Sequence, residues 1–277
     1  MTVTHYDADD GASLTVHIAG SGPDLVILHG WTSAYTDWRR LLERFEADFT
    51  CYFWEARPHR YGNGTVERMA RDLDRVVERF SLNKPLVVAH SMGAMVAWQY
   101  VRQFGCQSLG GLCIIDQSPK LITTSDWSLG LFGDFTEADN RRFIAEMERD
   151  FPAAALDLIA YSRSRGDGTK GPGIPSAILE PRRERLLKMT PEPWIACWRS
   201  FSVQDYRSVL PRIDVPALLI YGGRSGYYGR AVADYVRDRI PASRLRVYPE
   251  AGHSPHVEEP DAFYREVVSF GSELQWG

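Results

Sequence analysis

A serine at a sharp junction between a strand and a helix constrains this chain more than any other feature. Residues 86–88 (LVV) form a short apolar run typical of a strand buried on both faces. The segment AHSMG follows directly, and residues 94–99 then favour a helix. Positions two before and two after the serine crowd each other in such a turn and must be small, as Ala89 and Gly93 are. The pattern predicts a nucleophile elbow that presents Ser91 above the sheet.

The composition is that of an ordinary globular chain of 277 residues, long enough for one large domain or a domain with a sizeable insertion. Its net charge of −4 is too mild to indicate a nucleic-acid or anionic-membrane partner. The first residues do not resemble a signal peptide, and no apolar run is long enough to span a membrane. The four cysteines include no C-x-x-C pair that would indicate a zinc or redox site. We expect a cytoplasmic protein with free thiols and no bound metal.

Apolar runs alternate with helical periods along most of the chain. Strands are expected at 14–18, 24–28, 49–54, 86–88, 112–115, 217–221 and 245–248, and helices at 38–45, 67–80, 94–99, 229–240 and 261–270. Residues 118–206 instead favour helices, around 137–147, 153–161 and 182–189, with an aromatic-rich segment at 194–201 and a mobile Gly-, Ser- and Pro-rich loop at 164–175. This order predicts a mostly parallel, doubly wound sheet from residues 1–117 and 207–277, with a helical cap inserted at 118–206.

Groups that can carry chemistry follow the ends of several expected strands. They are His29-Gly30, Ser91, Asp116 and His253. The carboxyl ends of parallel strands meet at one edge of the sheet, where ligands bind, so we expect these groups to lie close together. Gly30 allows a turn that points the amide of Trp31 into a pocket, and the amide of Met92 lies at a helix N-terminus. These two amides are the expected oxyanion hole.

Together these features resemble the α/β-hydrolase family, in particular its serine-nucleophile esterase and haloperoxidase-like branch with a helical cap. The resemblance covers essentially the whole chain and is carried by HGW at 29–31, AHSMG at 89–93, AGHSPHVEEP at 251–260 and the inserted cap. The order of serine, acid and histidine also agrees with that family. It implies that Ser91 is the nucleophile, that His253 takes and returns its proton, and that an acid orients His253.

The chain departs from the family pattern at two places. Ala89 stands where glycine is usual, although it still meets the requirement for a small residue. The family usually carries its acid on the loop after the cap, but here that loop reads GGRSGY at 222–227. Since the usual position holds no acid, we favour Asp116 as the triad acid. Some members of the family carry their acid on this strand, whereas others keep an aspartate there as a turn cap. Glu250 and Asp214 are less well placed.

Three further basic side chains have two possible roles each or a local one. His90 is expected to face away from Ser91 and to pack or hydrogen-bond locally. Arg57 and His59, in the loop after the strand at 49–54, suit either the pocket wall or the surface.

The expected activity is that of a serine hydrolase that cleaves a small or medium carboxylic ester, lactone or thioester through an acyl-enzyme. Its substrate is expected to be a small apolar or aromatic molecule, bound by the cap residues Trp127, Trp194 and Trp198. No cofactor is required, because side chains and backbone amides fill every role. A C–C bond hydrolase, a cofactor-free ring-cleaving dioxygenase and a non-catalytic receptor remain alternatives, and the sequence does not indicate the oligomeric state.

Overall fold

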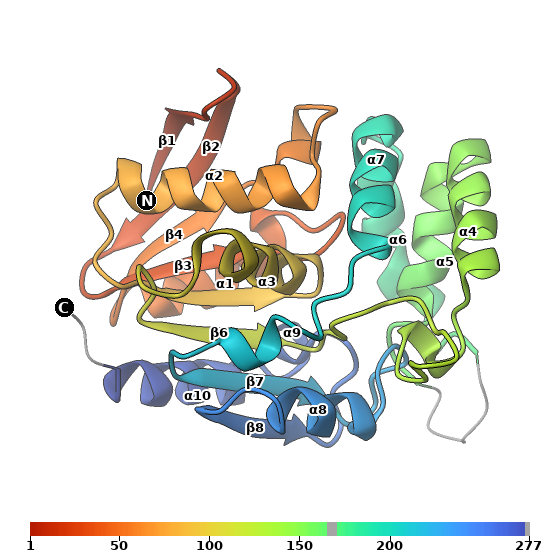
Figure 1. The fold of residues 1–277 in the computed structure, drawn as a ribbon. Coiled ribbons are helices and arrows are strands. Elements are labelled where there is room, and N and C mark those ends of the chain that lie inside the picture. The colour runs from red at the N-terminus through yellow and green to blue at the C-terminus, as the bar shows by residue number, and fades with distance from the viewer. Residues whose placement is uncertain (165–170, 275–277) are drawn as a thin grey trace.

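The computed structural model describes residues 1–164 and 171–274, which form a central sheet between two layers of helices, with further helices at one end (Figure 1). The strands are β1 (Thr2–Asp7), β2 (Ser13–Gly20), β3 (Asp24–Leu28), β4 (Thr50–Trp54), β5 (Leu86–His90), β6 (Gly111–Ile115), β7 (Ala217–Gly222) and β8 (Ser243–Tyr248). Their order across the sheet is β1-β2-β4-β3-β5-β6-β7-β8. β2 is antiparallel to β1 and β4, and the other neighbours are parallel, which confirms the predicted sheet.

Helices cover both faces of this sheet. α1 (Tyr35–Phe45) and α10 (Pro260–Ser272) pack on one face, and α2 (Val66–Arg79), α3 (Met92–Phe104) and α8 (Arg230–Arg237) pack on the other. α2 shows why such segments are helical: Thr65 caps its first turn by accepting a hydrogen bond from the amide of Arg68, at 3.2 Å. Its apolar side chains then recur at helical spacing and face the sheet.

The central strands are apolar along their whole length because both of their faces are covered. Every residue of β5, β6 and β7 is buried. β1 is different: it lies at the sheet edge, and only Tyr6 among its residues is fully buried. This strand was not predicted, because its sequence lacks the apolar pattern of a core strand.

In the described part of the chain between β6 and β7 there are four α-helices. They are α4 (Glu137–Arg149), α5 (Phe151–Ala160), α6 (Ser176–Leu186) and α7 (Pro191–Ser202), and they lie beyond the carboxyl ends of the parallel strands (Figure 1). α6 begins six residues before the predicted helix at 182–189 and contains Pro181. The mobile loop predicted at 164–175 lies partly outside the described residues, at 165–170. Short helical turns also occur at Arg57–His59, Leu131–Gly133, Leu210–Arg212 and α9 (Pro255–Glu258).

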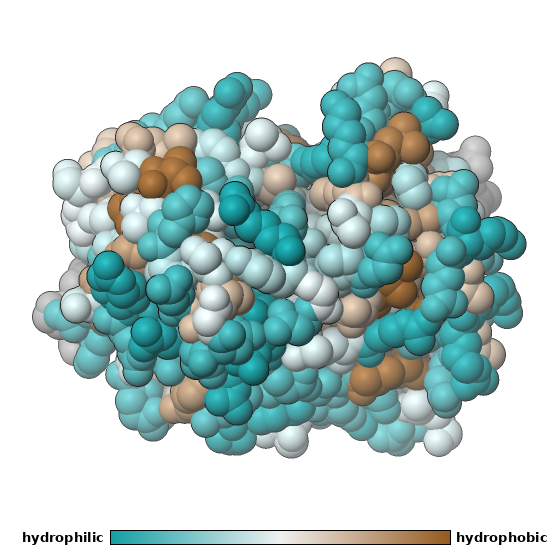
Figure 2. Space-filling view, turned by 90° about the horizontal axis from the view of Figure 1, so that it is seen from above, coloured by the Kyte–Doolittle hydropathy of each residue, from teal (hydrophilic) through white to brown (hydrophobic). Residues whose placement is uncertain are grey.

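The surface in Figure 2 is mostly hydrophilic, with larger hydrophobic patches toward the cap end of the molecule, on the right. Three large apolar side chains are exposed in this part of the chain: Ile178, Leu187 and Val203. Among the helices of the described residues, none has the length and apolarity needed to cross a membrane.

Candidate active site

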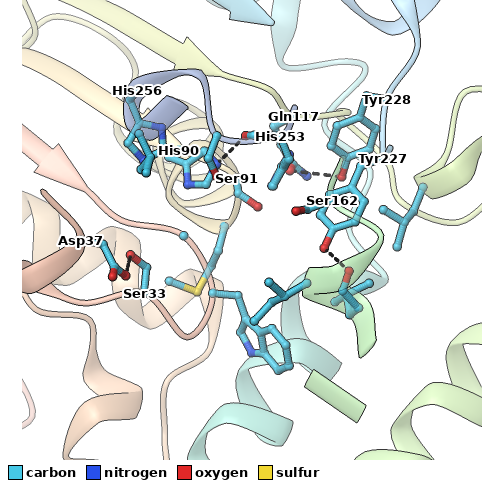
Figure 3. A pocket seen from close by; sticks show the side chains of 18 of the residues that line it. Ser33, Asp37, His90, Ser91, Gln117, Ser162, Tyr227, Tyr228, His253 and His256 are labelled. Carbon is cyan, nitrogen blue, oxygen red and sulfur yellow. Dashed lines mark hydrogen bonds between the residues drawn. The ribbon is translucent and has the colours of Figure 1, made fainter. Parts of the chain in front are cut away.

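Ser91 occupies the predicted turn between β5 and α3. Its backbone has φ 52° and ψ −116°, a strained conformation for a residue with a side chain. The turn requires glycine two residues later, because a Cβ on Gly93 would lie 2.3 Å from the carbonyl oxygen of Leu28. The amide of Ser91 donates to the carbonyl of Ile115 at 3.1 Å, which ties the turn to β6. The serine hydroxyl is thereby directed into a cavity (Figure 3).

Asp116 and His253 are 137 residues apart in sequence and meet beyond the carboxyl ends of the parallel strands. His253 Nδ1 donates a 2.6 Å hydrogen bond to Asp116 Oδ2, and Asp116 is fully buried. His253 lines the same cavity as Ser91. Within the described residues no hydrogen bond joins Ser91 Oγ to His253. The structure therefore brings together the three side chains predicted from the strand ends.

The loop after β7, which lacks the acid usual in the family, holds the carboxylate of Asp116 instead. The amide of Gly222 donates to Asp116 Oδ1 at 3.0 Å, and Ser225 Oγ donates to Oδ2 at 2.7 Å. Ser225 Oγ is held in turn by the amides of Tyr227 and Tyr228, each at 3.3 Å. Sequence reasoning missed Ser225, although its place in the loop that usually carries the acid was a signal.

His253 is also fixed through its backbone and its ring. Its amide donates to the carbonyl of Ser162 at 2.8 Å, and the ring of Tyr227 packs on it at 4.4 Å. His90 Nε2 donates to the carbonyl of His253 at 2.9 Å. His90 packs and hydrogen-bonds, as expected, but its hydrogen-bond partner lies in a loop 163 residues away, and it also lines the cavity.

Burial keeps three histidines around the site, His29, His90 and His256, neutral because it lowers their pKa values. Burial, reinforced by the neighbouring His256 and His253, lowers the pKa of His90 well below its usual value. Burial likewise lowers the pKa of His256 to about 3 and that of His29 to about 3. His29 is also held by hydrogen bonds: the amide of Ala56 donates to its Nε2 at 3.1 Å, which requires that nitrogen to be unprotonated.

The amides expected to form the oxyanion hole lie beside Ser91. Gly30 lies against the serine, since a Cβ on Gly30 would be 3.4 Å from Ser91 Cβ. The amide of the next residue, Trp31, is therefore close to Ser91. The Trp31 indole donates to the carbonyl of Trp194 at 3.1 Å, which fixes this turn against the cap. Met92 is the first residue of α3, where an amide has no partner within the helix.

The cavity holds about 800 Å³ of empty space, its open mouth included. Around Ser91 and His253 it is polar, with Ser162 and Gln117 nearby (Figure 3). Its apolar walls are formed by Trp31, Leu121, Leu131, Leu158, Trp198 and Phe201. A substrate with an apolar group fits this lining.

Of the three tryptophans expected to bind substrate, only Trp198 belongs to the described lining of this cavity. The indole of Trp127 donates to the carbonyl of Lys120 at 2.9 Å, and its ring packs on Tyr235 at 4.7 Å. The ring of Trp194 is buried against His59 at 4.9 Å. Both rings join elements of the fold, so we do not retain Trp127 and Trp194 as binding residues.

Arg57 lies neither in the cavity lining nor on the surface, contrary to both expectations. Its guanidinium is fully buried and pairs with Asp72 at 2.6 and 2.7 Å and with Asp10 at 2.9 and 3.0 Å. His59 Nε2 donates to the carbonyl of Ser33 at 2.9 Å. Over residues 1–164 and 171–274, no three His, Cys, Asp or Glu side chains are grouped so as to hold a metal ion.

The sheet order, the strained serine turn and the buried aspartate–histidine pair define an α/β-hydrolase fold. The sequence profile of the alpha/beta hydrolase family matches residues 25–266, so the chain belongs to this family. Two bacterial relatives bear the name pimeloyl-(acyl-carrier protein) methyl ester esterase. The one from Vibrio atlanticus is 27% identical over 263 residues, which cover 92% of this chain and 96% of the relative. The one from Nitrosomonas europaea is 25% identical over 259 residues, which cover 91% and 97%.

Solved structures share the same fold. An esterase from Exiguobacterium antarcticum superposes with a TM-score of 0.83 at 21% identity, covering 98% of this chain and 100% of that one. A bromoperoxidase from Bacillus anthracis superposes with a TM-score of 0.82 at 18% identity, with the same coverage. At these identities the likeness concerns the fold alone.

Proposed function

We propose that this protein is a serine esterase that hydrolyses a carboxylic ester through Ser91, His253 and Asp116. The observation that carries the proposal is the 2.6 Å hydrogen bond from His253 to the buried Asp116 beside the cavity that Ser91 enters. The relatives support it, because they are named esterases and align with this chain over nearly their whole length.

In the proposed reaction, Ser91 Oγ attacks the carbonyl carbon of the ester while His253 Nε2 takes its proton. Asp116 holds His253 with Nδ1 protonated and stabilises the imidazolium that forms. The amides of Trp31 and Met92 donate to the developing oxyanion, a contribution of about 3–4 kcal/mol for each donor. His253 then protonates the leaving alcohol. In the second half of the reaction, a water molecule gives a proton to His253 while its oxygen attacks the acyl carbon, and His253 returns that proton to Ser91 Oγ as the carboxylic acid leaves.

The substrate class follows from the cavity walls and from the relatives. The walls facing away from His253 are apolar, which suits an alkyl or aryl acyl group. The relatives are named for a methyl ester on an acyl chain, so we propose that simple methyl esters of medium-chain acids are also substrates. Lactones and thioesters undergo the same acyl transfer and should be assayed as substrates in the same experiment.

The test is hydrolysis of p-nitrophenyl and methyl esters by the wild-type protein and the Ser91→Ala variant, with oxygen uptake followed in parallel. We expect ester turnover in the wild type that the variant lacks. Retained turnover in Ser91→Ala would exclude the proposed nucleophile. Oxygen uptake with a heteroaromatic substrate and no turnover of any ester would favour the dioxygenase alternative.

A further inference from the structure

A second cavity lies in the cap, directly behind the apolar wall of the active-site cavity. It holds about 470 Å³, part of it open to solvent, and its lining is almost entirely apolar. Leu158 and Trp198 line both cavities, so these two side chains form the partition between them. On the far side of the partition lie Phe132, Phe135 and Phe143.

Hydrogen bonds and ring contacts hold Trp198 in place. Its indole Nε1 donates to Asn140 Oδ1 at 2.8 Å, and Asn140 Nδ2 donates to Ser202 Oγ at 3.2 Å. Its ring packs edge-on against Trp31 at 5.3 Å and Phe143 at 4.7 Å. Only 3% of Trp198 is exposed, so its indole cannot swing aside without breaking a buried hydrogen bond.

Leu158 is held from the catalytic side. Its carbonyl accepts a 2.7 Å hydrogen bond from the hydroxyl of Tyr227. The ring of Tyr227 packs on His253 at 4.4 Å, and the two residues lie side by side in Figure 3. The partition is therefore tied to the catalytic histidine on one side and to α4 and α7 on the other. A fixed partition sets a fixed depth for the active-site cavity.

The acyl chain is the part of an ester that meets this partition. The leaving alcohol must face His253, because His253 returns the proton to it. The acyl chain therefore extends away from His253, toward the wall where Trp31 packs against Trp198. We propose that Trp198 and Leu158 limit the length of the acyl chain that the enzyme accepts, and that the second cavity becomes an extension of the acyl site when this partition is opened. This inference rests on the proposed esterase function.

The experiment measures kcat/KM for p-nitrophenyl esters from acetate to laurate, which share one leaving group. Each methylene that enters an apolar site contributes about 0.8 kcal/mol, so kcat/KM should rise about fourfold per methylene until the chain reaches the partition, and then fall. In Trp198→Leu and Leu158→Ala the maximum should move to longer acyl chains. The control Phe135→Leu, which changes only the second cavity, should leave the position of the maximum unchanged.

Two results would overturn the inference. One is a wild-type kcat/KM that keeps rising up to laurate, which needs no variant to be seen. The other is an unchanged maximum in either opened variant that retains a cooperative thermal transition. Absence of ester turnover in the wild type across the whole series would instead contradict the proposed function, so the two failures are distinguishable.

Discussion

Replacing Asp116 by asparagine keeps the shape of the side chain but removes one of the two acceptor oxygens that its surroundings require. Three groups surround the carboxylate, and all of them donate: His253 Nδ1 at 2.6 Å, Ser225 Oγ at 2.7 Å and the amide of Gly222 at 3.0 Å. An asparagine has one acceptor oxygen and one donor NH₂ group. If its oxygen faces His253, its NH₂ opposes the amide of Gly222, and in the other orientation its NH₂ opposes His253.

The second orientation is favoured when His253 changes tautomer, so that Nδ1 accepts and Nε2 carries the proton. A histidine in that tautomer cannot take the proton of Ser91. The same substitution in the Ser-His-Asp triad of a serine protease lowers kcat by about 10⁴, equivalent to roughly 5.4 kcal/mol of transition-state stabilisation. We therefore expect Asp116→Asn to lower kcat for p-nitrophenyl butyrate by about four orders of magnitude, with a much smaller change in KM.

Two controls separate this effect from a general loss of charge. Glu250 is the nearest carboxylate in sequence to the histidine loop, and its side chain is exposed and paired with Arg224. Glu250→Gln and Asp214→Asn should both leave kcat unchanged. The proposed placement would be contradicted if Asp116→Asn kept a kcat within tenfold of wild type while kcat fell in either control. The triad acid would then be another carboxylate.

Three other predictions concern Ser225, the buried ion pair of Arg57 and the buried histidines. Ser225→Ala removes one hydrogen bond to the Asp116 carboxylate and leaves two, so kcat should fall about tenfold at constant KM, and Ser225→Thr should restore it. Arg57→Ala leaves the buried carboxylate of Asp72 unpaired and should lower the free energy of unfolding in urea by about 3–5 kcal/mol, whereas no loss would contradict the ion pair. His29 and His256 have pKa values of about 3 when folded, below the unfolded value of 6.5, so their contribution is present above pH 6.5 and is lost as the pH falls toward 3. The free energy of unfolding should fall by about 2 kcal/mol for each between pH 7 and pH 5, and an equal free energy at both values would exclude buried neutral rings.

The serine turn could be predicted because its requirements are local. A buried strand, small residues on both sides of Ser91 and a following helix are all adjacent in sequence. The meeting of Asp116 and His253 could also be predicted, since parallel topology brings strand ends together whatever the loops do. Their hydrogen bond is the geometric outcome of that topology.

The features that could not be predicted depend on packing between distant segments. Arg57 has the sequence context of a surface loop residue, and its burial depends on Asp72 and Asp10 arriving from α2 and from the loop after β1. The cap tryptophans have similar local contexts, yet Trp198 lines the cavity while the ring of Trp194 packs on His59. Aromatic content predicts that a cap has apolar surfaces, but the crossing of its helices decides which of them face the substrate.

The most direct measurement is intact-mass spectrometry of the protein after reaction with an alkyl fluorophosphonate, a probe that phosphonylates activated serines. The wild type should gain the mass of one phosphonyl group, mapped to Ser91, and should lose its ester turnover in proportion to the labelled fraction. Ser91→Ala should gain nothing. Full ester turnover in a wild-type protein labelled at Ser91, or labelling at another serine with loss of activity, would contradict Ser91 as the nucleophile.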